Sequence, residues 1–395
     1  MAATKSSGIT WIGDIPKEWE MKKIKYISTL KGRIGWQGLT SDEYTDEGAY
    51  LITGTDFDNG GINWDTCVHV PMKRWEEAKD IQIENGDLLI TKDGTVGKVA
   101  IVDGLDSPCS LNSGVLRIST INGYDRRFLF WVLQSEVFWT WFANKNAGNS
   151  TILHLYQGDF AEFNYAIPPL HEQRAIADLL DDRCGQVDGI ISDLEKQVEI
   201  LHRYKKALIT ETVTANKPHW IKGRIKDLMT LQRGYDLPQD DFIEGDYPVY
   251  GSNGIVGWHN KFTTAGPGIT IGRSGSVGEV NYVDRDFWAH NTSIFVKNRK
   301  GNDIRFLYYA LLSFDIKELA SGSAVPTLDR KNVEAVHLLF PTGIQEQQTI
   351  ATYLDEKCAE IDALTVEKRK ATEVMRQYKK SLIYEYVTGK KRVIS

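Results

Sequence analysis

Residues Glu172–Thr214 read EQRAIADLLDDRCGQVDGIISDLEKQVEILHRYKKALITETVT, and residues Glu346–Thr388 read EQQTIATYLDEKCAEIDALTVEKRKATEVMRQYKKSLIYEYVT. The second stretch follows the first at a constant offset of 174 residues, without a gap. Identical residues recur along the whole alignment, from the opening Glu-Gln to the closing Val-Thr. Chance does not give this density of identities at one offset, so the segment is an internal repeat.

Both copies of the repeat have the pattern of a long helix. In the first copy, apolar residues recur in alternating steps of four and three, interrupted only at Lys205, and no proline lies between Leu170 and Lys217. Such a heptad seam needs a partner, so we expect the two copies to pair as antiparallel helices. The alternative is two solvated helices, each packed on its own domain. The residues predicted to pair the helices are Val187, Ile191, Leu194, Val198, Leu201 and Leu208 in the first copy and Ile361, Leu364, Met375, Tyr378 and Leu382 in the second.

Weaker similarities precede each copy. Trp19 and Trp220 open corresponding stretches, and Gly86–Val99 resembles Gly268–Val280. Each of the latter is an apolar run, a glycine turn and a second run, which predicts a β-hairpin. The later Ser110–Ser113 and His290–Ser293 are also similar, but the offset drifts, so the loops differ in length.

The repeat divides the chain into four parts. Residues 1–168 and 216–342 are predicted to form two recognition domains, and residues 169–215 and 343–395 two helical spacers. The expected fold class is α+β, with two globular mixed α/β domains joined by two long antiparallel coiled-coil helices in a pseudo-twofold repeat. Because the helices match closely while the loops have diverged, we expect each domain to recognise a different target.

The composition is that of an ordinary globular protein. The 395 residues carry a formal net charge of −6 and four scattered cysteines that form no C-x-x-C pair, so neither a zinc site nor a disulfide framework is expected. No run of about 18 apolar residues predicts a membrane span, and the N-terminus lacks the apolar core of a signal peptide.

No motif predicts a catalytic centre or a metal site. The loop Gly94–Lys98 departs from the Walker pattern, because Lys92 stands where a glycine is needed and Val99 follows the lysine. The only Pro-Pro pair, at Pro168, is not in an adenine-methyltransferase motif, and Glu77-Ala78-Lys79 matches a nuclease pattern too short to be specific. The eight histidines form no H-E-x-x-H or H-x-x-E-H pattern. The chain is therefore not expected to be an enzyme.

The two junctions and the N-terminus resemble the specificity subunit of type I restriction-modification enzymes over the whole chain. The most specific part is a proline-apolar-x-Glu-Gln-x-x-Ile start to a long helix, at residues 169–177 and again at 344–351. The opening stretch Gly8–Trp19 is also similar to that family's N-terminus. The second junction departs slightly, with Pro341-Thr342-Gly343 in place of Pro168-Pro169-Leu170.

The resemblance implies a non-catalytic, cytoplasmic subunit of a prokaryotic defence system. Each domain would read one half of a split, asymmetric site in double-stranded DNA. The paired helices would set the spacing and dock two modification subunits, which bind S-adenosylmethionine and methylate adenine. Restriction subunits, which use ATP and magnesium, would join the complex. No cofactor is expected on this chain.

The acidic net charge counts against DNA binding, because neutralised phosphates supply much of the affinity. The acidic residues concentrate at the helix starts, where we expect them to face partner subunits or each other, whereas basic residues occur in the domains. Arginine, asparagine and glutamine in loops can contact base edges. The residues predicted to contact DNA are Arg33, Trp36, Gln37, Asn59, Lys92 and Thr95 in the first domain and Arg233, Tyr235, Ser252, Asn253, Arg273 and Ser274 in the second.

Two other functions stay open at this point. The chain could be a coiled-coil scaffold that holds proteins and never touches DNA, which the sequence pI of about 5.8 favours. Gel-shift assays with and without modification subunits would discriminate. A single-chain enzyme is disfavoured by the missing motifs, and a methyl-transfer assay on the isolated chain would test it.

Overall fold

The computed structural model describes residues 3–33, 39–147, 153–322 and 326–393. It contains two compact units, one formed by Met1–Ser192 with Thr372–Ser395 and the other by Asp193–Ala371. Each unit therefore combines a globular domain with one end of each long helix. The C-terminal part of the second helix belongs to the unit of the first domain, although residues 216–342 separate the two in sequence.

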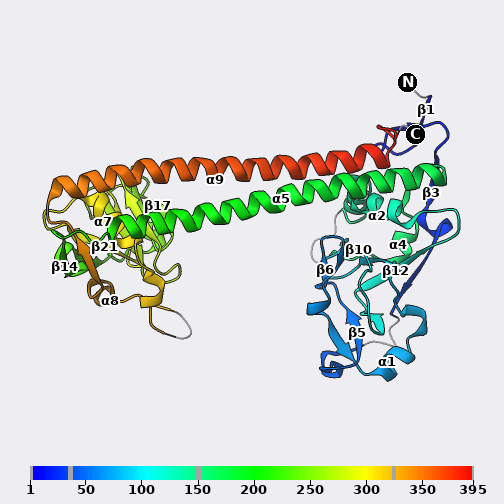
Figure 1. The fold of residues 1–395 in the computed structure, drawn as a ribbon, viewed down its shortest axis with the longest axis horizontal. Coiled ribbons are helices and arrows are strands. Elements are labelled where there is room, and N and C mark those ends of the chain that lie inside the picture. The colour runs from blue at the N-terminus through cyan, green and yellow to red at the C-terminus, as the bar shows by residue number, and fades with distance from the viewer. Residues whose placement is uncertain (1–2, 34–38, 148–152, 323–325, 394–395) are drawn as a thin grey trace. The chain divides into compact units, whose positions relative to one another are not determined.

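The repeated segments are two continuous helices, α5 over Leu170–Val213 and α9 over Ile344–Val387, each of 44 residues (Figure 1). They run antiparallel. In the second unit Lys205 Nζ lies 2.7 Å from Asp362 Oδ2, and in the first unit Lys379 Nζ lies 2.6 Å from Asp188 Oδ2. The two ion pairs are equivalent under the 174-residue repeat, which confirms the pseudo-twofold relation between the helices.

The structure corrects the predicted pairing surface of α9. Val187, Ile361 and Leu382 are buried, and the other predicted residues of α5 are half-buried. Leu364 and Tyr378, however, are exposed. The seam of α9 keeps the phase of α5 and passes through polar residues, namely Thr365, Lys368, Thr372 and Lys379. These polar residues conceal the heptad in the sequence. The prediction therefore places the neighbouring apolar residues Leu364 and Tyr378 on the pairing surface, where the structure has Thr365 and Lys379.

The domain of the first unit contains a four-stranded sheet in the order β10-β9-β12-β4 and a three-stranded sheet in the order β11-β5-β8. A separate pair, β13 with β3, leads into α5. The strands are β1 (Thr4–Ser6), β2 (Asp14–Pro16), β3 (Glu20–Lys23), β4 (Ser28–Gly32), β5 (Ala49–Ile52), β6 (Phe57–Asp58), β7 (Gly61–Ile62), β8 (Val68–Val70), β9 (Leu88–Thr91), β10 (Val99–Ile101), β11 (Cys109–Leu111), β12 (Val115–Thr120) and β13 (Asn164–Ile167). The α-helices are α1 (Met72–Glu76), α2 (Arg126–Gln134), α3 (Glu136–Lys145) and α4 (Gln157–Ala161).

The domain of the second unit repeats this topology, with sheets in the orders β15-β21-β18-β19 and β17-β16-β20 and the pair β14 with β22. Both three-stranded sheets contain one parallel and one antiparallel pairing. The strands are β14 (Ile221–Arg224), β15 (Thr230–Arg233), β16 (Tyr247–Gly251), β17 (Gly254–His259), β18 (Gly268–Gly272), β19 (Val280–Val283), β20 (Trp288–Ala289), β21 (Ser293–Asn298) and β22 (His337–Phe340). The α-helices are α6 (Ile225–Leu228), α7 (Ile304–Leu312) and α8 (Arg330–Glu334).

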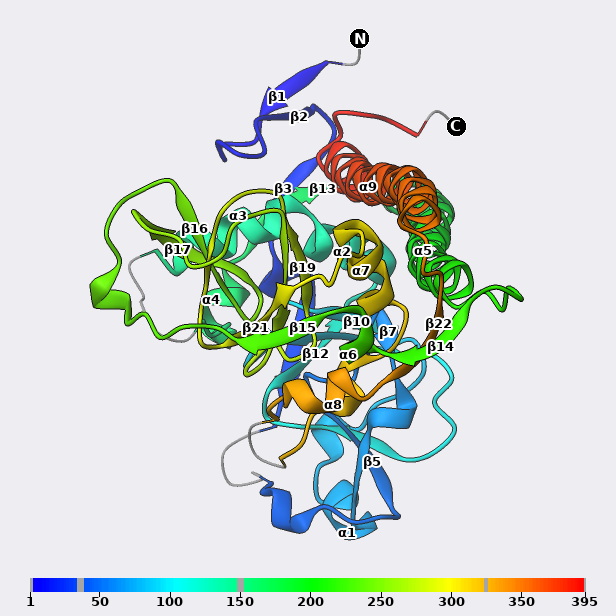
Figure 2. The same ribbon diagram turned by 90° about the vertical axis from the view of Figure 1, so that its left-hand side faces the viewer.

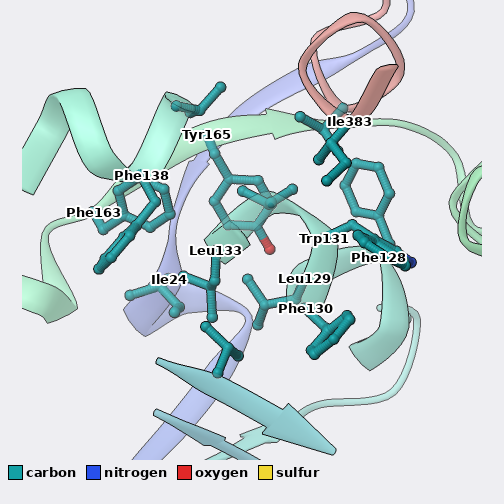
Figure 3. Close-up of a cluster of buried hydrophobic side chains, with 14 of the residues drawn as sticks. Ile24, Phe128, Leu129, Phe130, Trp131, Leu133, Phe138, Phe163, Tyr165 and Ile383 are labelled. Atoms are coloured by element: carbon teal, nitrogen blue, oxygen red, sulfur yellow. The ribbon is translucent and has the colours of Figure 1, made fainter. Parts of the chain in front are cut away.

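Helices α2 and α7 connect each sheet to the long helices. In the first unit, Phe128 and Trp131 of α2 share one apolar cluster with Ile383 of α9 (Figure 3). Asp125 caps α2 by accepting hydrogen bonds from Arg127 N and Phe128 N. Helix α7 has the corresponding position in the second unit, between the long helices and β19 (Figure 2), and its Phe306 shares one apolar cluster with Leu354 of α9 and Ile269 of β18. The buried faces of these short helices therefore fix each sheet on the helix pair.

Within the described ranges, no helix has the length and apolar character needed to cross a membrane.

Candidate nucleic-acid interface

Each domain presents one hairpin loop at the same place in its sheet, as the glycine turns predict. The β9–β10 loop begins at Lys92, and the β18–β19 loop begins at Arg273. Lys92 N donates to Gly114 O at 2.8 Å, and Arg273 N donates to Thr292 O at 2.9 Å. The carbonyl oxygen of each accepts from a leucine of a third segment, Leu155 or Leu328, at 2.9 Å. Lys92 and Arg273 therefore occupy equivalent positions in the two hairpins, and their backbones make equivalent hydrogen bonds.

The residues before β12 align with those before β21 in a different register from the one that the sequence predicts. Asn112 N donates to Ile52 O, and His290 N donates to the equivalent carbonyl, Tyr250 O, both at 2.9 Å. Asn112 thus corresponds to His290, which shifts the predicted match of Ser110–Ser113 with His290–Ser293 by two residues. The drifting offset of the loops concealed this shift.

A second turn supports each hairpin loop. In the first domain, Thr95 Oγ1 donates to Gly54 O at 3.1 Å. In the second, the turn between β16 and β17 packs so closely that a Cβ atom on Gly272 would lie 2.3 Å from Ser252 O. Only glycine fits there, and the contact brings the predicted residues Ser252 and Asn253 beside Arg273 and Ser274.

A basic hollow lies at the base of the second hairpin loop. Arg233 and Arg273, both predicted DNA contacts, line it together with Arg330, and the hollow has a volume of about 350 Å³. Arg330 is held by a hydrogen bond from Nη1 to Leu231 O at 2.8 Å. Asp329 also lines the hollow, so its charge is not wholly positive. Sequence reasoning missed Arg330 because it lies at the start of α8 among alternating charges.

The predicted residue Tyr235 lines a different hollow of the second domain, together with Phe295 and Lys297. It is 40% exposed, its hydroxyl accepts a hydrogen bond from Gln232 Nε2 at 3.0 Å, and its ring centroid lies 5.9 Å from that of Phe295. One face of the ring therefore packs on the domain, while the rest reaches solvent.

The first domain brings together fewer of its predicted residues. Thr95 is exposed and Lys92 half-buried on the hairpin loop, whereas the exposed Asn59 lines a different hollow beside Lys98 and Trp139. Trp36 and Gln37 lie outside the described residues. His154, which sequence reasoning did not single out, forms an ion pair with Asp93 on the hairpin loop when its ring is protonated.

Arg33 has a structural position that differs from the one expected. Its side chain is 5% exposed, with Nε donating to Leu111 O at 2.7 Å and Nη2 to Ser110 Oγ at 3.1 Å. Burial lowers the pKa of its guanidinium. These bonds tie β4 to β11, so a structural role accounts for Arg33 better than a base contact does.

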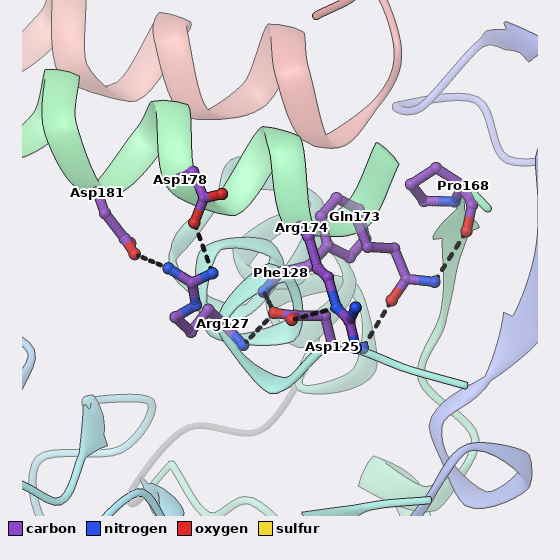
Figure 4. Close-up of polar contacts among 8 residues, drawn as sticks. All are labelled: Asp125, Arg127, Phe128, Pro168, Gln173, Arg174, Asp178 and Asp181. Atoms are coloured by element: carbon purple, nitrogen blue, oxygen red, sulfur yellow. Dashed lines mark hydrogen bonds and ion pairs between the residues drawn. The ribbon is translucent and has the colours of Figure 1, made fainter. Parts of the chain in front are cut away.

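The repeated Glu-Gln motif forms a polar junction between each domain and its long helix. Gln173 accepts from Asp125 N and donates to Pro168 O, both at 2.8 Å (Figure 4). Gln347 makes the equivalent bonds with Asp303 N and Pro341 O, both at 2.9 Å. The preceding glutamates accept from the indoles of Trp19 and Trp220 at 2.9 and 3.0 Å. The motif therefore sets the position of each domain on its helix.

The end of each long helix returns to the junction glutamate of the other helix. After α5, Lys217 and His219 bind Glu346. The hydrogen bond from Trp220, together with those from His219 and Lys217, lowers the pKa of Glu346 to about 2. After α9, Arg392 Nε donates to Glu172 Oε1 at 2.6 Å. Each junction glutamate is thus bound by basic residues that follow the other long helix, although the positions differ, because Arg392 corresponds to Pro218 in the repeat.

Several acidic residues at the helix starts are neutralised within their own unit. Arg127 donates to Asp178 and Asp181 at 2.6 and 2.8 Å (Figure 4). Arg305 Nε donates to Asp355 Oδ2 at 3.0 Å. These three aspartates therefore pair with arginines of their own domain, which reduces the net negative charge at the helix starts, whereas the expectation that the acidic residues there face partner subunits or each other stays a prediction.

Among the residues that the structure describes, no group of three or more His, Cys, Asp or Glu side chains is placed to hold a metal ion.

Comparisons with known proteins converge on one family. The family described as "Type I restriction modification DNA specificity domain" matches residues 16–208 and 218–373. The type I restriction enzyme MjaIX specificity subunit of Methanocaldococcus jannaschii is 22% identical, over 97% of this chain and 96% of that protein. The EcoprrI specificity subunit of Escherichia coli is 23% identical, over 68% of this chain and 70% of that protein.

Solved structures share the fold. A chain from work described as "Structural basis underlying complex assembly and conformational transition of the type I R-M system" has a TM-score of 0.75 at 15% identity, over 95% of this chain and 99% of that chain. The HsdS subunit from Thermoanaerobacter tengcongensis has a TM-score of 0.56 at 15% identity, over 98% and 100% of the two chains.

Proposed function

Because this chain belongs to the type I restriction-modification DNA specificity family, we propose that its two domains read the two halves of one bipartite, asymmetric DNA site. The observation that supports this proposal most is that the two hairpin loops share their backbone geometry but differ in their side chains. The hairpin loops share their backbone hydrogen bonds, yet they present Lys92 in one domain and Arg273 in the other. Two hairpin loops with the same backbone hydrogen bonds but different side chains are suited to recognising two different base sequences.

The second domain has the stronger chemistry for base recognition. Arginine is the side chain that most often reads guanine, through two hydrogen bonds in the major groove, and Arg233, Arg273 and Arg330 line one hollow. Lysine, as at position 92, is a point charge that more often contacts phosphate. The remaining predicted loop residues, Asn59, Thr95, Tyr235, Ser252, Asn253 and Ser274, keep their proposed roles as DNA contacts.

The rest of the proposal concerns the complex. The paired helices set the spacing between the half-sites and dock two modification subunits, which carry S-adenosylmethionine, while restriction subunits use ATP and magnesium. This chain supplies recognition and performs no catalysis of its own. The acidic net charge favours a scaffold that never touches DNA, and a gel-shift titration of the complex with sequence-matched and scrambled DNA separates that function from this one.

We expect Arg273→Ala to weaken recognition at one half-site only. The loss of a two-bond base contact costs about 1–3 kcal/mol, so methylation of the wild-type site should fall about 5- to 150-fold. The measurement is methylation-site mapping of the complex, in which tolerated sequence changes should be confined to one half-site. The matched control is Arg285→Ala, because Arg285 is an exposed arginine of the same domain whose Nε pairs with Asp284. Wild-type sites and rates for Arg273→Ala would count against the assignment.

A further inference from the structure

The first domain contains a hollow of about 400 Å³ beside the β9–β10 hairpin. Three parts of the domain form it, namely the β6–β7 turn, the start of β10, and the end of α2 with the following helix α3. Asp58, Asn59, Lys98 and Gln134 supply its polar lining, and Trp139 supplies an aromatic wall. Sites of this size bind small molecules through a few placed polar groups on an apolar surface.

Packing holds the walls of the hollow in position. The β6–β7 turn is fixed on both sides, since Gly60 O accepts a hydrogen bond from Ile101 N at 3.0 Å and a Cβ atom on Gly60 would lie 2.8 Å from Phe130 Cζ. Trp139 lies against Gly97, where a Cβ atom would be 2.5 Å from Cη2 of the indole. The hollow is therefore preformed by close contacts between separate elements.

The polar groups around the hollow have hydrogen-bonding capacity that the fold does not use. Within the part of the chain that the structure describes, Gln134 Nε2 is buried without a hydrogen-bond partner. The exposed side chains of Asp58 and Asn59 make no hydrogen bond or ion pair with other described residues. Buried donors in folded proteins are nearly always paired, and the hollow that Gln134 lines has the space for a partner.

The second domain shows that the shared fold does not need the amide. Asp125 caps α2 and Asp303 caps α7, and both helices have nine residues, so they correspond at an offset of 178. At this offset Leu312 stands where the first domain has Gln134. Leucine leaves no polar group without a partner, so Gln134 is not required to build the helix or its packing.

Trp139 is replaced in the same way. The same offset aligns it with Lys317. Gly97 and Gly278 make equivalent backbone hydrogen bonds at 2.9 Å, and a Cβ atom on Gly278 would lie 2.8 Å from Lys317 Cγ. The second domain also has no strand pair between β16 and β17 that would correspond to β6 and β7. The hollow is therefore an addition of the first domain to a common fold.

The lining residues have the chemistry of a nucleotide site. The indole of Trp139 is 38% exposed and can stack on a base, because every base has a π-face. The amides of Gln134 and Asn59 offer donors and acceptors, and such amides pair with the edge of a purine. Lys98 can hold a phosphate, and Asp58 can accept a hydrogen bond from a sugar hydroxyl or a base amino group. One charge of each sign makes a general anion site unsuitable.

We propose that this hollow binds one purine nucleotide, with the base against Trp139, the base edge at Gln134 and Asn59, and the phosphate at Lys98. A free nucleotide and an unpaired nucleotide of a bound DNA strand present the same groups, so the test includes both sources. The proposal does not rest on the reading of half-sites, because every residue of the site belongs to the first domain.

The test is a calorimetric titration of the full-length chain with adenosine monophosphate, which should bind at one site per chain. Trp139→Leu removes the stacking surface and should weaken binding about 5- to 150-fold. Gln134→Leu introduces the residue of the second domain and should weaken it about 2- to 13-fold. Asn59→Gly removes the amide and keeps the backbone, since the φ of 44° suits glycine, and its loss should be similar to that of Gln134→Leu.

The control variant is Tyr26→Leu, which removes an aromatic side chain that is 63% exposed in the same unit and outside the hollow, and it should bind as the wild type does. The melting temperature of Gln134→Leu should not fall, because the buried amide has no hydrogen bond to lose. A lower melting temperature with unchanged affinity would assign Gln134 to the fold and contradict its role in binding.

Two further ligands test the recognition of the base. Ribose phosphate, which has no base, and uridine monophosphate should each bind at least about fivefold more weakly than adenosine monophosphate. Equal affinity for either would overturn the recognition of a purine.

A short single-stranded oligodeoxyadenylate distinguishes the two sources of the nucleotide. Tighter binding than that of adenosine monophosphate, with the same loss in Trp139→Leu, would assign the site to a DNA strand, and weaker binding would assign it to a free nucleotide. Binding of neither ligand, or binding that none of the three hollow variants weakens, would overturn the proposal and leave the reading of half-sites untouched.

Discussion

Removing one heptad from each long helix, residues 191–197 and 365–371, is expected to shorten the spacer of the DNA site. Seven helical residues contribute about 10.5 Å, so the spacer should lose up to about three base pairs. A full heptad keeps the seam in phase, and both interhelical ion pairs, Lys205–Asp362 and Lys379–Asp188, lie outside the deleted residues. The half-site sequences should not change, because the domains are untouched.

The measurement is the set of methylated sites in cells that carry the variant with its modification subunit. Inserting one heptad at the same two positions is the control, and it should lengthen the spacer. A spacer of unchanged length in both variants would show that the helices do not set it.

Gln347→Leu is expected to destabilise the second unit by about 2–5 kcal/mol. The side chain is fully buried, accepts from Asp303 N, and donates to Pro341 O and to Asn302 Oδ1 at 2.7 Å. Leucine has nearly the same volume but leaves these buried groups without partners, and each such group costs about 1–3 kcal/mol. Because Asp303 also caps α7, the loss should reach the contact between α7 and the long helices.

The free energy of unfolding should be measured by urea titration and followed by a probe in the second unit. The neighbouring residue Gln348 is exposed on the same turn of α9, so Gln348→Leu is a matched control that should change the free energy by less than about 0.5 kcal/mol. Equal stabilities for the two variants would mean that the glutamine bonds contribute nothing to the junction.

The helical part of the fold could be predicted because its signal is local. The heptad steps and the constant offset predict two equivalent helices, and the structure begins and ends them at equivalent residues. The hairpins were predictable for the same reason, since glycine turns between apolar runs act over a few residues. The prediction that Leu364 and Tyr378 pair the helices is wrong, because it followed the apolar residues of the second copy. The heptad positions of the first copy, transferred by the constant offset, would have given the correct seam.

The contacts that depend on distant residues could not be read from the sequence. Arg33 is buried because β4 crosses near β11, and Arg330 reaches the basic hollow because α8 packs under β15. Arg392 binds Glu172 only because the end of α9 returns to the first domain. Each of these positions is set by topology, and a basic residue in a loop looks the same in sequence whether it is buried, paired or presented to DNA.

Methylome sequencing of a host that expresses this chain with its modification subunit, beside the same host without it, tests directly whether the two domains read two half-sites. We expect one new methylated motif, made of two unlike half-sites separated by a spacer of fixed length. Two identical half-sites, a continuous motif without a spacer, or no new motif from an assembled and active complex would contradict it.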